Sequence, residues 1–147
     1  DHSAEPCVSP LSDLPRPYES MSGLYRVVPV KTRHEVHVTW QLPTQLRNWE
    51  CKPTEFVGHL VGHEGRGSLL SRLKDQGLAT AVCAGSSGEG YDTNTFCEMF
   101  TVRVDLRESA FGRWREALEC IFGYLRMLRD VEVWPRHLYE ELETSAR

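Results

Sequence analysis

The sequence predicts an α+β fold, a two-layer sandwich in which a mainly antiparallel sheet carries helices on one face. Two observations predict it. Segments with the two-residue alternation of half-buried strands come in pairs, and segments with helical spacing follow each pair. The order is therefore two strands, two helices, two strands and two helices, which is typical of an α+β domain.

The size and composition fit one ordinary globular domain. The chain has 147 residues, of which 40% are hydrophobic and 26% charged, enough to bury a core without disulfide or metal staples. Its formal net charge of −4 gives no basic field for nucleic acid or for an anionic membrane. No apolar run approaches the roughly 20 residues that span a bilayer. We therefore predict no nucleic-acid partner and no membrane span in this piece of chain.

The cysteines are five in number and scattered, and no CxxC pair occurs. The sequence therefore favours neither a structural zinc site nor a disulfide framework. We interpret them as buried or stray thiols, which leaves the redox compartment open. They are Cys7, Cys51, Cys83, Cys97 and Cys120.

The two ends of the chain indicate a piece of a longer protein. Residues 1–17 are polar and rich in proline and are predicted to form a linker or arm, and residues 18–147 the domain itself. The chain begins at Asp1 without a methionine or a leader, and it ends at Arg147 directly after an expected helix.

A hairpin is expected first in the domain, formed by residues 24–30 and 34–43. In the second run Val36, Val38 and Trp40 alternate with polar residues, which is the period of a half-buried strand. The first run, LYRVVPV, is apolar and lies close enough in sequence to pair with it.

Two helices are expected next. The first covers residues 52–62 and has Pro53 in its first turn, where proline is tolerated. In the second, Ser68 can cap a short helix through Lys74, and Gly77 is well placed to end it.

The second half of the domain repeats this order. Strands are expected over residues 78–85 and 96–106, joined by the glycine-rich turn GSSGEGYD. A long helix should begin near residue 108, and a last helix should cover about 135–144. The apolar stripe of the long helix consists of Phe111, Trp114, Leu118, Ile121, Phe122, Leu125 and Leu128.

The run FVGHLVGHEGRGSLLSRLKDQG, residues 56–77, contains the candidate chemistry. Gly62 and Gly67 have the spacing of a GxxxxGK[ST] phosphate loop. However, Ser68 stands where the lysine is needed, and the loop follows a helix rather than a strand. The dinucleotide fingerprint fails as well, because Leu70 occupies its third glycine position. Phosphate binding is therefore not favoured.

A zinc site is incomplete in the same run. His59 and His63 are four residues apart, so one helical face can carry both imidazoles. An HxxEH site also needs a glutamate before the second histidine, as the general base for zinc-bound water. Gly62 stands there in one frame, and Gly58 in the frame that ends at His59. No zinc hydrolase site is predicted, and zinc binding by His59 and His63 alone stays an alternative.

The glycines of this run leave main chain uncovered beside Glu64. The strand that follows ends in small residues and runs into Gly85. Such a corner suits an added peptide strand, held by backbone hydrogen bonds, with Glu64 or a nearby carbonyl accepting from the peptide's α-ammonium group. The alternative is a glycine-rich packing corner without a ligand.

The stretch GHLVGHEGRGSLLSRLKDQG, preceded by LYRVVPVK and VHVTWQLP, resembles the second domain of the M16 zinc metallopeptidases of the insulysin and nardilysin type. VRVDL and ALECIFGYLRMLRDVEVWPRHLYEELE follow the same pattern, so the resemblance covers about Leu24 to the end of the last expected helix. It implies the M16 fold, also called LuxS–MPP-like. In that family two halves close around a chamber, and each half holds two homologous α+β domains. The first domain carries HxxEH and zinc, and the second has lost that site.

The resemblance implies a non-catalytic domain that walls the chamber and anchors the substrate's N-terminus at an exosite, as an added β-strand. It implies no metal or cofactor in this piece, Zn²⁺ in the sister domain, and as partners peptide substrates, the other M16 domains of the chain and a second copy in a homodimer. The rival is an interaction or scaffold domain of a parent whose active site has also decayed. By position, the exosite residues are His59, Gly62, Glu64, Val82, Ala84 and Gly85, with Ala84 standing where the family tends to glycine.

Overall fold

The computed structural model describes residues 23–86 and 92–131. The elements are the strands β1 (Glu35–Pro43), β2 (Ala79–Gly85) and β3 (Cys97–Leu106) and the helices α1 (Pro53–Gly62), α2 (Leu69–Asp75) and α3 (Trp114–Arg129). Short 3₁₀ helices cover Leu46–Asn48 and Glu108–Arg113.

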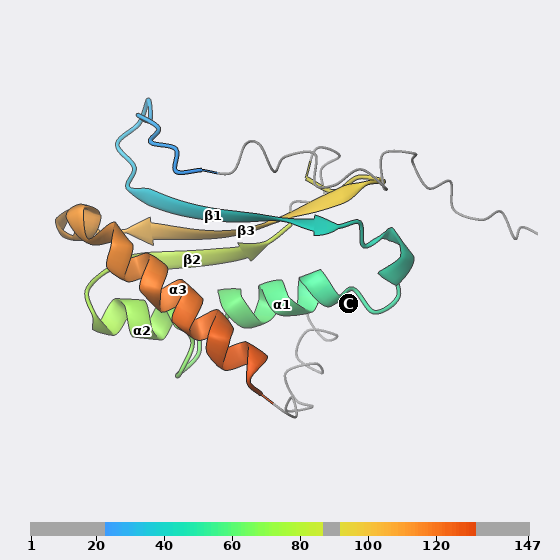
Figure 1. The fold of residues 1–147 in the computed structure, drawn as a ribbon. Coiled ribbons are helices and arrows are strands. Elements are labelled where there is room, and N and C mark those ends of the chain that lie inside the picture. The colour runs from blue at the N-terminus through green and yellow to red at the C-terminus, as the bar shows by residue number, and fades with distance from the viewer. Residues whose placement is uncertain (1–22, 87–91, 132–147) are drawn as a thin grey trace, which may run out of the picture.

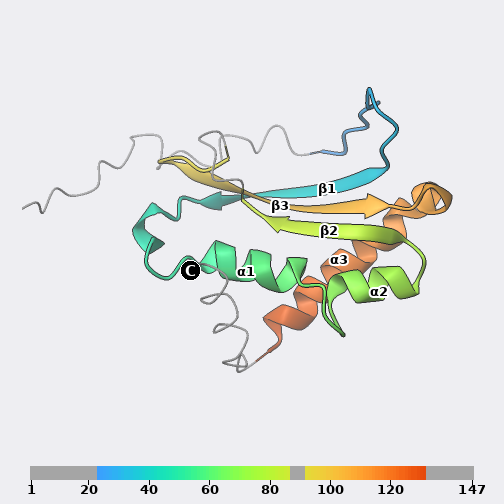
Figure 2. The same cartoon turned by 180° about the vertical axis from the view of Figure 1, so that it is seen from behind.

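The three strands form one antiparallel sheet in the order β1-β3-β2. β3 is central, and β1 and β2 are the edges of the sheet that the described residues form. Figures 1 and 2 show the helices gathered on one side of the sheet, with α1 running beside β2 in both views and α3 crossing the sheet. This confirms the predicted α+β class, with helices on one face of an antiparallel sheet.

The core lies between the sheet and the helices. Val38 lies opposite Val102, and Trp40 lies opposite Phe100, with ring centroids 6.3 Å apart. Both pairs belong to or pack against the buried cluster. The alternation that predicts β1 is therefore confirmed, because directly opposed residues share a face of the sheet.

The short helices begin and end largely as the sequence predicts. Pro53 is the first residue of α1. The Ser68 hydroxyl accepts a hydrogen bond from the Ser71 backbone N–H at 3.1 Å and so caps α2. Gly77 follows α2 with a φ of +66°, a conformation that suits glycine.

The expected hairpin is wrong. Among the described residues no strand precedes β1, and β1 pairs with β3 along its whole length. Pro29 has no backbone N–H and interrupts any ladder in its run, and apolar composition alone names no pairing partner. Large side chains of this run are strongly exposed, between 67% and 105%: Leu24, Tyr25, Val27, Val28 and Val30.

The long helix begins six residues later than expected. Residues Glu108–Arg113 form the 3₁₀ helix instead, and Gly112 in this run disfavours an α-helix. Phe111 is consequently exposed, and Phe122 is half exposed and contacts Trp40 edge to face at 6.0 Å. The buried residues of α3 are Ala117, Cys120, Ile121 and Leu128, so only part of the predicted stripe faces the core.

Three expectations lie wholly or partly outside the described residues: the N-terminal arm over 1–17, most of the glycine-rich turn, and the last helix over about 135–144. Across residues 23–86 and 92–131, no helix has both the length and the apolar character needed to cross a membrane.

Candidate functional site

The glycines of α1 allow this helix to lie directly against the backbone of β2. A Cβ atom on Gly58 would lie 3.0 Å from the carbonyl oxygen of Ala84 and 3.1 Å from the Cα of Gly85. A Cβ atom on Gly62 would lie 3.6 Å from the backbone nitrogen of Ala84. The structure therefore brings Gly62 together with the end of β2, at the edge of the described sheet.

The side chains of Val82 and Ala84 point into the core. Val82 lies opposite Val104 and Ala84 lies opposite Val102, and both partners are fully buried. The two residues can thus offer only main-chain groups at this edge of the described sheet. The methyl group of Ala84, where the family pattern tends to glycine, faces the core side of the sheet and not the edge.

The end of β2 has a special backbone. Gly85 has a φ of +143°, a region that residues with a side chain rarely adopt. The next residue, Ser86, donates a hydrogen bond from its hydroxyl to Glu98 at 2.5 Å. Glu98 lies on β3 and is only 3% exposed. The strand end is therefore tied to the central strand.

The two histidines of the run lie side by side. Their ring centroids are 6.0 Å apart, and the rings are nearly perpendicular. The Gly65 N–H donates to His63 Nδ1 at 3.0 Å, so this nitrogen is engaged in the loop. His59 Nε2 is buried and accepts or donates no hydrogen bond within the described part of the chain.

These residues do not fit a zinc hydrolase site. Such a site takes three protein ligands and a general base, whereas Gly58 and Gly62 stand at the two base positions. In the portion of the chain that the structure describes, no group of three or more His, Cys, Asp or Glu side chains could hold a metal ion.

Glu64 lies two residues beyond Gly62, in the loop between α1 and α2, and is exposed. The loop turns at Gly67, which has a φ of +80°, and the Ser68 N–H donates to the Gly65 carbonyl at 3.2 Å. Glu64 is thus a solvent-exposed acidic side chain on the loop that follows Gly62, the last residue of α1, and Gly62 lies against β2.

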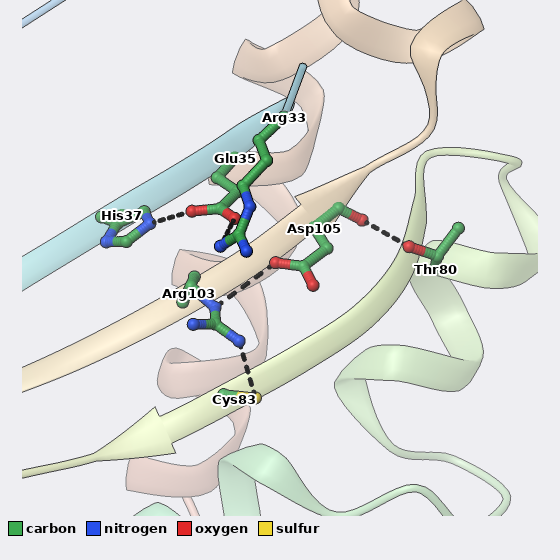
Figure 3. Close-up of polar contacts among 7 residues, drawn as sticks. All are labelled: Arg33, Glu35, His37, Thr80, Cys83, Arg103 and Asp105. Carbon is green, nitrogen blue, oxygen red and sulfur yellow. Dashed lines mark hydrogen bonds and ion pairs between the residues drawn. The ribbon is translucent and has the colours of Figure 1, made fainter. Parts of the chain in front are cut away.

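The outer face of the sheet carries charged residues that no motif in the sequence marks as a site (Figure 3). Arg103 lies opposite Cys83 on β2, and its Nη2 is 3.6 Å from the Cys83 sulfur. Its Nε is 3.3 Å from Asp105 Oδ1. The alternation of Met99, Thr101 and Arg103 along the strand is the signal that places Arg103 on this face.

Glu35 and His37 extend the charged surface along β1. His37 Nε2 lies 2.9 Å from Glu35 Oε2 (Figure 3). This hydrogen bond lowers the pKa of Glu35, against an opposing effect of burial, and the charges of His37, Arg103 and Arg33 lower it further. The Glu35 carboxyl group is thus held in its charged form.

Comparisons with known proteins assign the family. A profile described as "Peptidase M16 inactive domain" matches residues 3–142. Nardilysin from Rattus norvegicus is 33% identical over 134 residues, which are 90% of this chain and 12% of that protein. A nardilysin-like protein from Arabidopsis thaliana is 36% identical over 122 residues, 82% of this chain and 12% of its own length.

The A-factor-processing enzyme of Saccharomyces cerevisiae is 32% identical over 127 residues, 86% of this chain and 11% of that enzyme. The crystal structure of pitrilysin has the same fold, with a TM-score of 0.68 and 21% identity, and the match covers 77% of this chain and 12% of that one. The chain thus spans about an eighth of the length of these relatives. It belongs to the M16 peptidase family, as an inactive domain of the insulysin and nardilysin type.

Proposed function

We propose that this domain anchors the free N-terminus of a peptide along β2, in an M16 zinc peptidase whose hydrolysis takes place in another domain. The observation that carries the proposal is the packing of α1 on β2. A Cβ atom on Gly58 would come within 3.0 Å of the Ala84 carbonyl oxygen, and one turn later a Cβ atom on Gly62 would lie 3.6 Å from the Ala84 nitrogen. An edge strand beside a glycine corner offers main-chain donors and acceptors to an added strand.

The peptide would be held in two ways. Main-chain groups of Val82 to Gly85 would pair with the peptide backbone, while the side chains of Val82 and Ala84 stay in the core. Glu64 and the carbonyl of Gly62 would accept hydrogen bonds from the α-ammonium group. Hydrogen bonds between charged groups are about twice as strong as neutral ones, so the free amino group would decide affinity.

The parent protein would supply the chemistry. Zinc in the sister domain would activate a water molecule for peptide hydrolysis, and the present domain would form part of the chamber wall beside it. This chain's own residues would bind and orient the peptide and carry no proton in the reaction.

Competition assays on the zinc-loaded full-length protein test the anchor. Short peptides with a free and with an acetylated N-terminus would compete against a fluorogenic reporter peptide. Acetylation removes the ammonium charge, so we expect the acetylated peptide to compete about tenfold less well, in the range of a charge-assisted hydrogen bond. Equal inhibition by both peptides would refute the anchor.

Variants assign the anchor to Glu64. Glu64→Gln should weaken binding of the peptide with a free N-terminus and leave binding of the acetylated peptide unchanged. Glu119→Gln is the matched control, because Glu119 is an exposed glutamate on α3, and it should change neither. If the Glu64→Gln protein keeps the full preference for the free over the acetylated N-terminus, the role of Glu64 is refuted, and main-chain carbonyl groups bind the ammonium group instead.

The rival function is that of a scaffold domain in a peptidase that has lost its active site. The full-length sequence distinguishes the two functions. The full-length sequence either contains an intact HxxEH motif with a downstream glutamate ligand, or it does not. Its absence would leave peptide binding without hydrolysis, and turnover of the reporter peptide would then stay at the uncatalysed level.

A further inference from the structure

We propose that Arg103 is a specificity-determining residue that selects an acidic side chain in the bound peptide, at the position beside Cys83. The inference rests on the proposed function, in that β2 must accept a peptide strand at its free edge. It adds the chemical class of peptide that this strand would take.

The direction of the Arg103 side chain is the first observation. Arg103 lies on the central strand β3, directly opposite Cys83 on the edge strand. Its guanidinium group points toward β2, where Nη2 lies 3.6 Å from the Cys83 sulfur (Figure 3). A thiol is small and only a weak acceptor. The positive charge is thus directed toward the edge strand, and within residues 23–86 and 92–131 the hydrogen-bond partner of Nη2 is this sulfur and not an oxygen.

The second observation is that the guanidinium group has donors to spare. Arginine carries five N–H donors in a planar fork that matches a carboxylate. The ion pair with Asp105 joins Nε to Oδ1 at 3.3 Å, yet both atoms lack a hydrogen bond in the described part of the chain. The side chain is 40% exposed. An incoming carboxylate could therefore use the Nη groups while the pair with Asp105 stays in place.

The spacing of strands brings a peptide side chain within reach. A strand added to the edge lies roughly 4.8 Å from β2, and directly paired side chains lie about 5 Å apart. On the outer face the peptide residue beside Cys83 would meet the Arg103 guanidinium group over this small side chain. The next outer-face position lies beside Ala81, whose partner on β3 is Asp105, so a second acidic residue there would meet a negative charge.

The arrangement therefore predicts a preference for an acidic residue at one position of the peptide and not a general preference for acidic peptides. Glutamate or aspartate beside Cys83 is favoured, and the same residue two positions along, beside Ala81, is disfavoured. Because the pair is partly exposed, the preference should decrease in high salt.

A glutamate scan on the full-length protein tests the assignment. Competitor peptides with a free N-terminus would carry a single Glu or Gln at each of the first six positions. At one position Glu should bind roughly two- to fivefold more tightly than Gln, the range of an exposed ion pair. Arg103→Gln should bring the ratio of the affinities for the Glu and Gln peptides to about one. Arg103→Glu should produce a preference for Lys at the same position. A reversal of sign cannot arise from a merely loosened sheet, which would weaken all peptides alike.

Controls separate this inference from the anchor. Arg113→Gln removes another half-exposed arginine, one paired with Glu116, and should leave the Glu-to-Gln ratio unchanged. If acetylation weakens binding but the ratio is the same in wild-type and Arg103→Gln protein, the anchor holds and the role of Arg103 is refuted. If acetylation has no effect, the proposed function fails, and the role of Arg103 fails with it.

Discussion

At the scale of single residues, Gly58 sets the distance between α1 and β2. The methyl carbon of an alanine there would lie 3.0 Å from the Ala84 oxygen and 3.1 Å from the Gly85 Cα. Backbone atoms cannot rotate away as a side chain can. The helix would have to move off the strand that we propose as the peptide edge.

Gly58→Ala should therefore destabilise the chain. Overpacking costs typically 1–3 kcal/mol, and the better helix propensity of alanine offsets up to about 1 kcal/mol of this. We expect a net loss of about 1 kcal/mol in urea unfolding. Gly62→Ala is the matched control, because its Cβ would lie 3.6 Å from the Ala84 nitrogen, an ordinary contact. Equal stabilities of the two variants would contradict the close approach at Gly58.

Glu35 gives a second prediction at this scale. Its pKa lies below the ordinary value of 4.5, chiefly because His37 donates a hydrogen bond to its carboxylate. His37→Ala should raise the pKa of Glu35 toward that value, as followed by NMR of its carboxyl carbon. Arg33→Ala should move it less, since Arg33 is the smallest of the contributing charges.

The sign of the linked stability follows from the lowered pKa. The charged form of Glu35 is favoured in the folded chain, so its contribution is present above about pH 4.5 and is lost as the pH falls through the lowered pKa. A contribution that grew as the pH fell below 4.5 would contradict the lowered pKa of Glu35.

At the scale of elements, residues 24–30 and β3 show how burial differs from apolar composition. Both runs are rich in valine, yet Val28 is 93% exposed while Val102 is fully buried. Val102 belongs to the buried cluster between the sheet and the described helices, whereas Val28 lies outside this cluster. The sequence pattern of the first run is therefore not sufficient to place it in the sheet.

Matched substitutions measure this difference. Val102→Ala should cost about 2 kcal/mol in the free energy of unfolding, because it removes two buried methyl groups from a packed core. Val28→Ala should change it by less than about 0.5 kcal/mol, as is usual at exposed positions. Chemical denaturation of both variants would decide, and a large loss from Val28→Ala would mean that the run is packed in solution.

At the scale of the whole molecule, metal chemistry is the property that the inactive domain should lack. His59 and His63 offer two imidazoles, whereas protein zinc sites take three or four protein ligands. After dialysis against zinc-free buffer, the purified chain should retain well below one zinc ion, and EDTA should leave its Tm unchanged. One zinc per chain would show that the histidine pair recruits further ligands.

Much of the local structure could be predicted from the sequence, because it depends on neighbours in the chain. Pro53 at the start of α1, the Ser68 cap of α2 and the alternation of β1 and β3 all follow from local geometry. The false hairpin could not be foreseen in the same way, because it depends on whether a distant element packs on an apolar run, and composition does not contain that information. The late start of α3 has a local cause, since Gly112 disfavours an α-helix, and the apolar stripe alone does not reveal it.

The sequence by itself determined the α+β class, the short helices and the missing general base, since each is a matter of residue type and spacing. Tertiary structure decided which strand is an edge, that the Ala84 methyl group faces the core, and that the Arg103 side chain points toward Cys83. The physical reason is that strand order and side-chain direction across a sheet are set by pairing between segments far apart in the chain. No local pattern along one segment specifies which segment lies beside it.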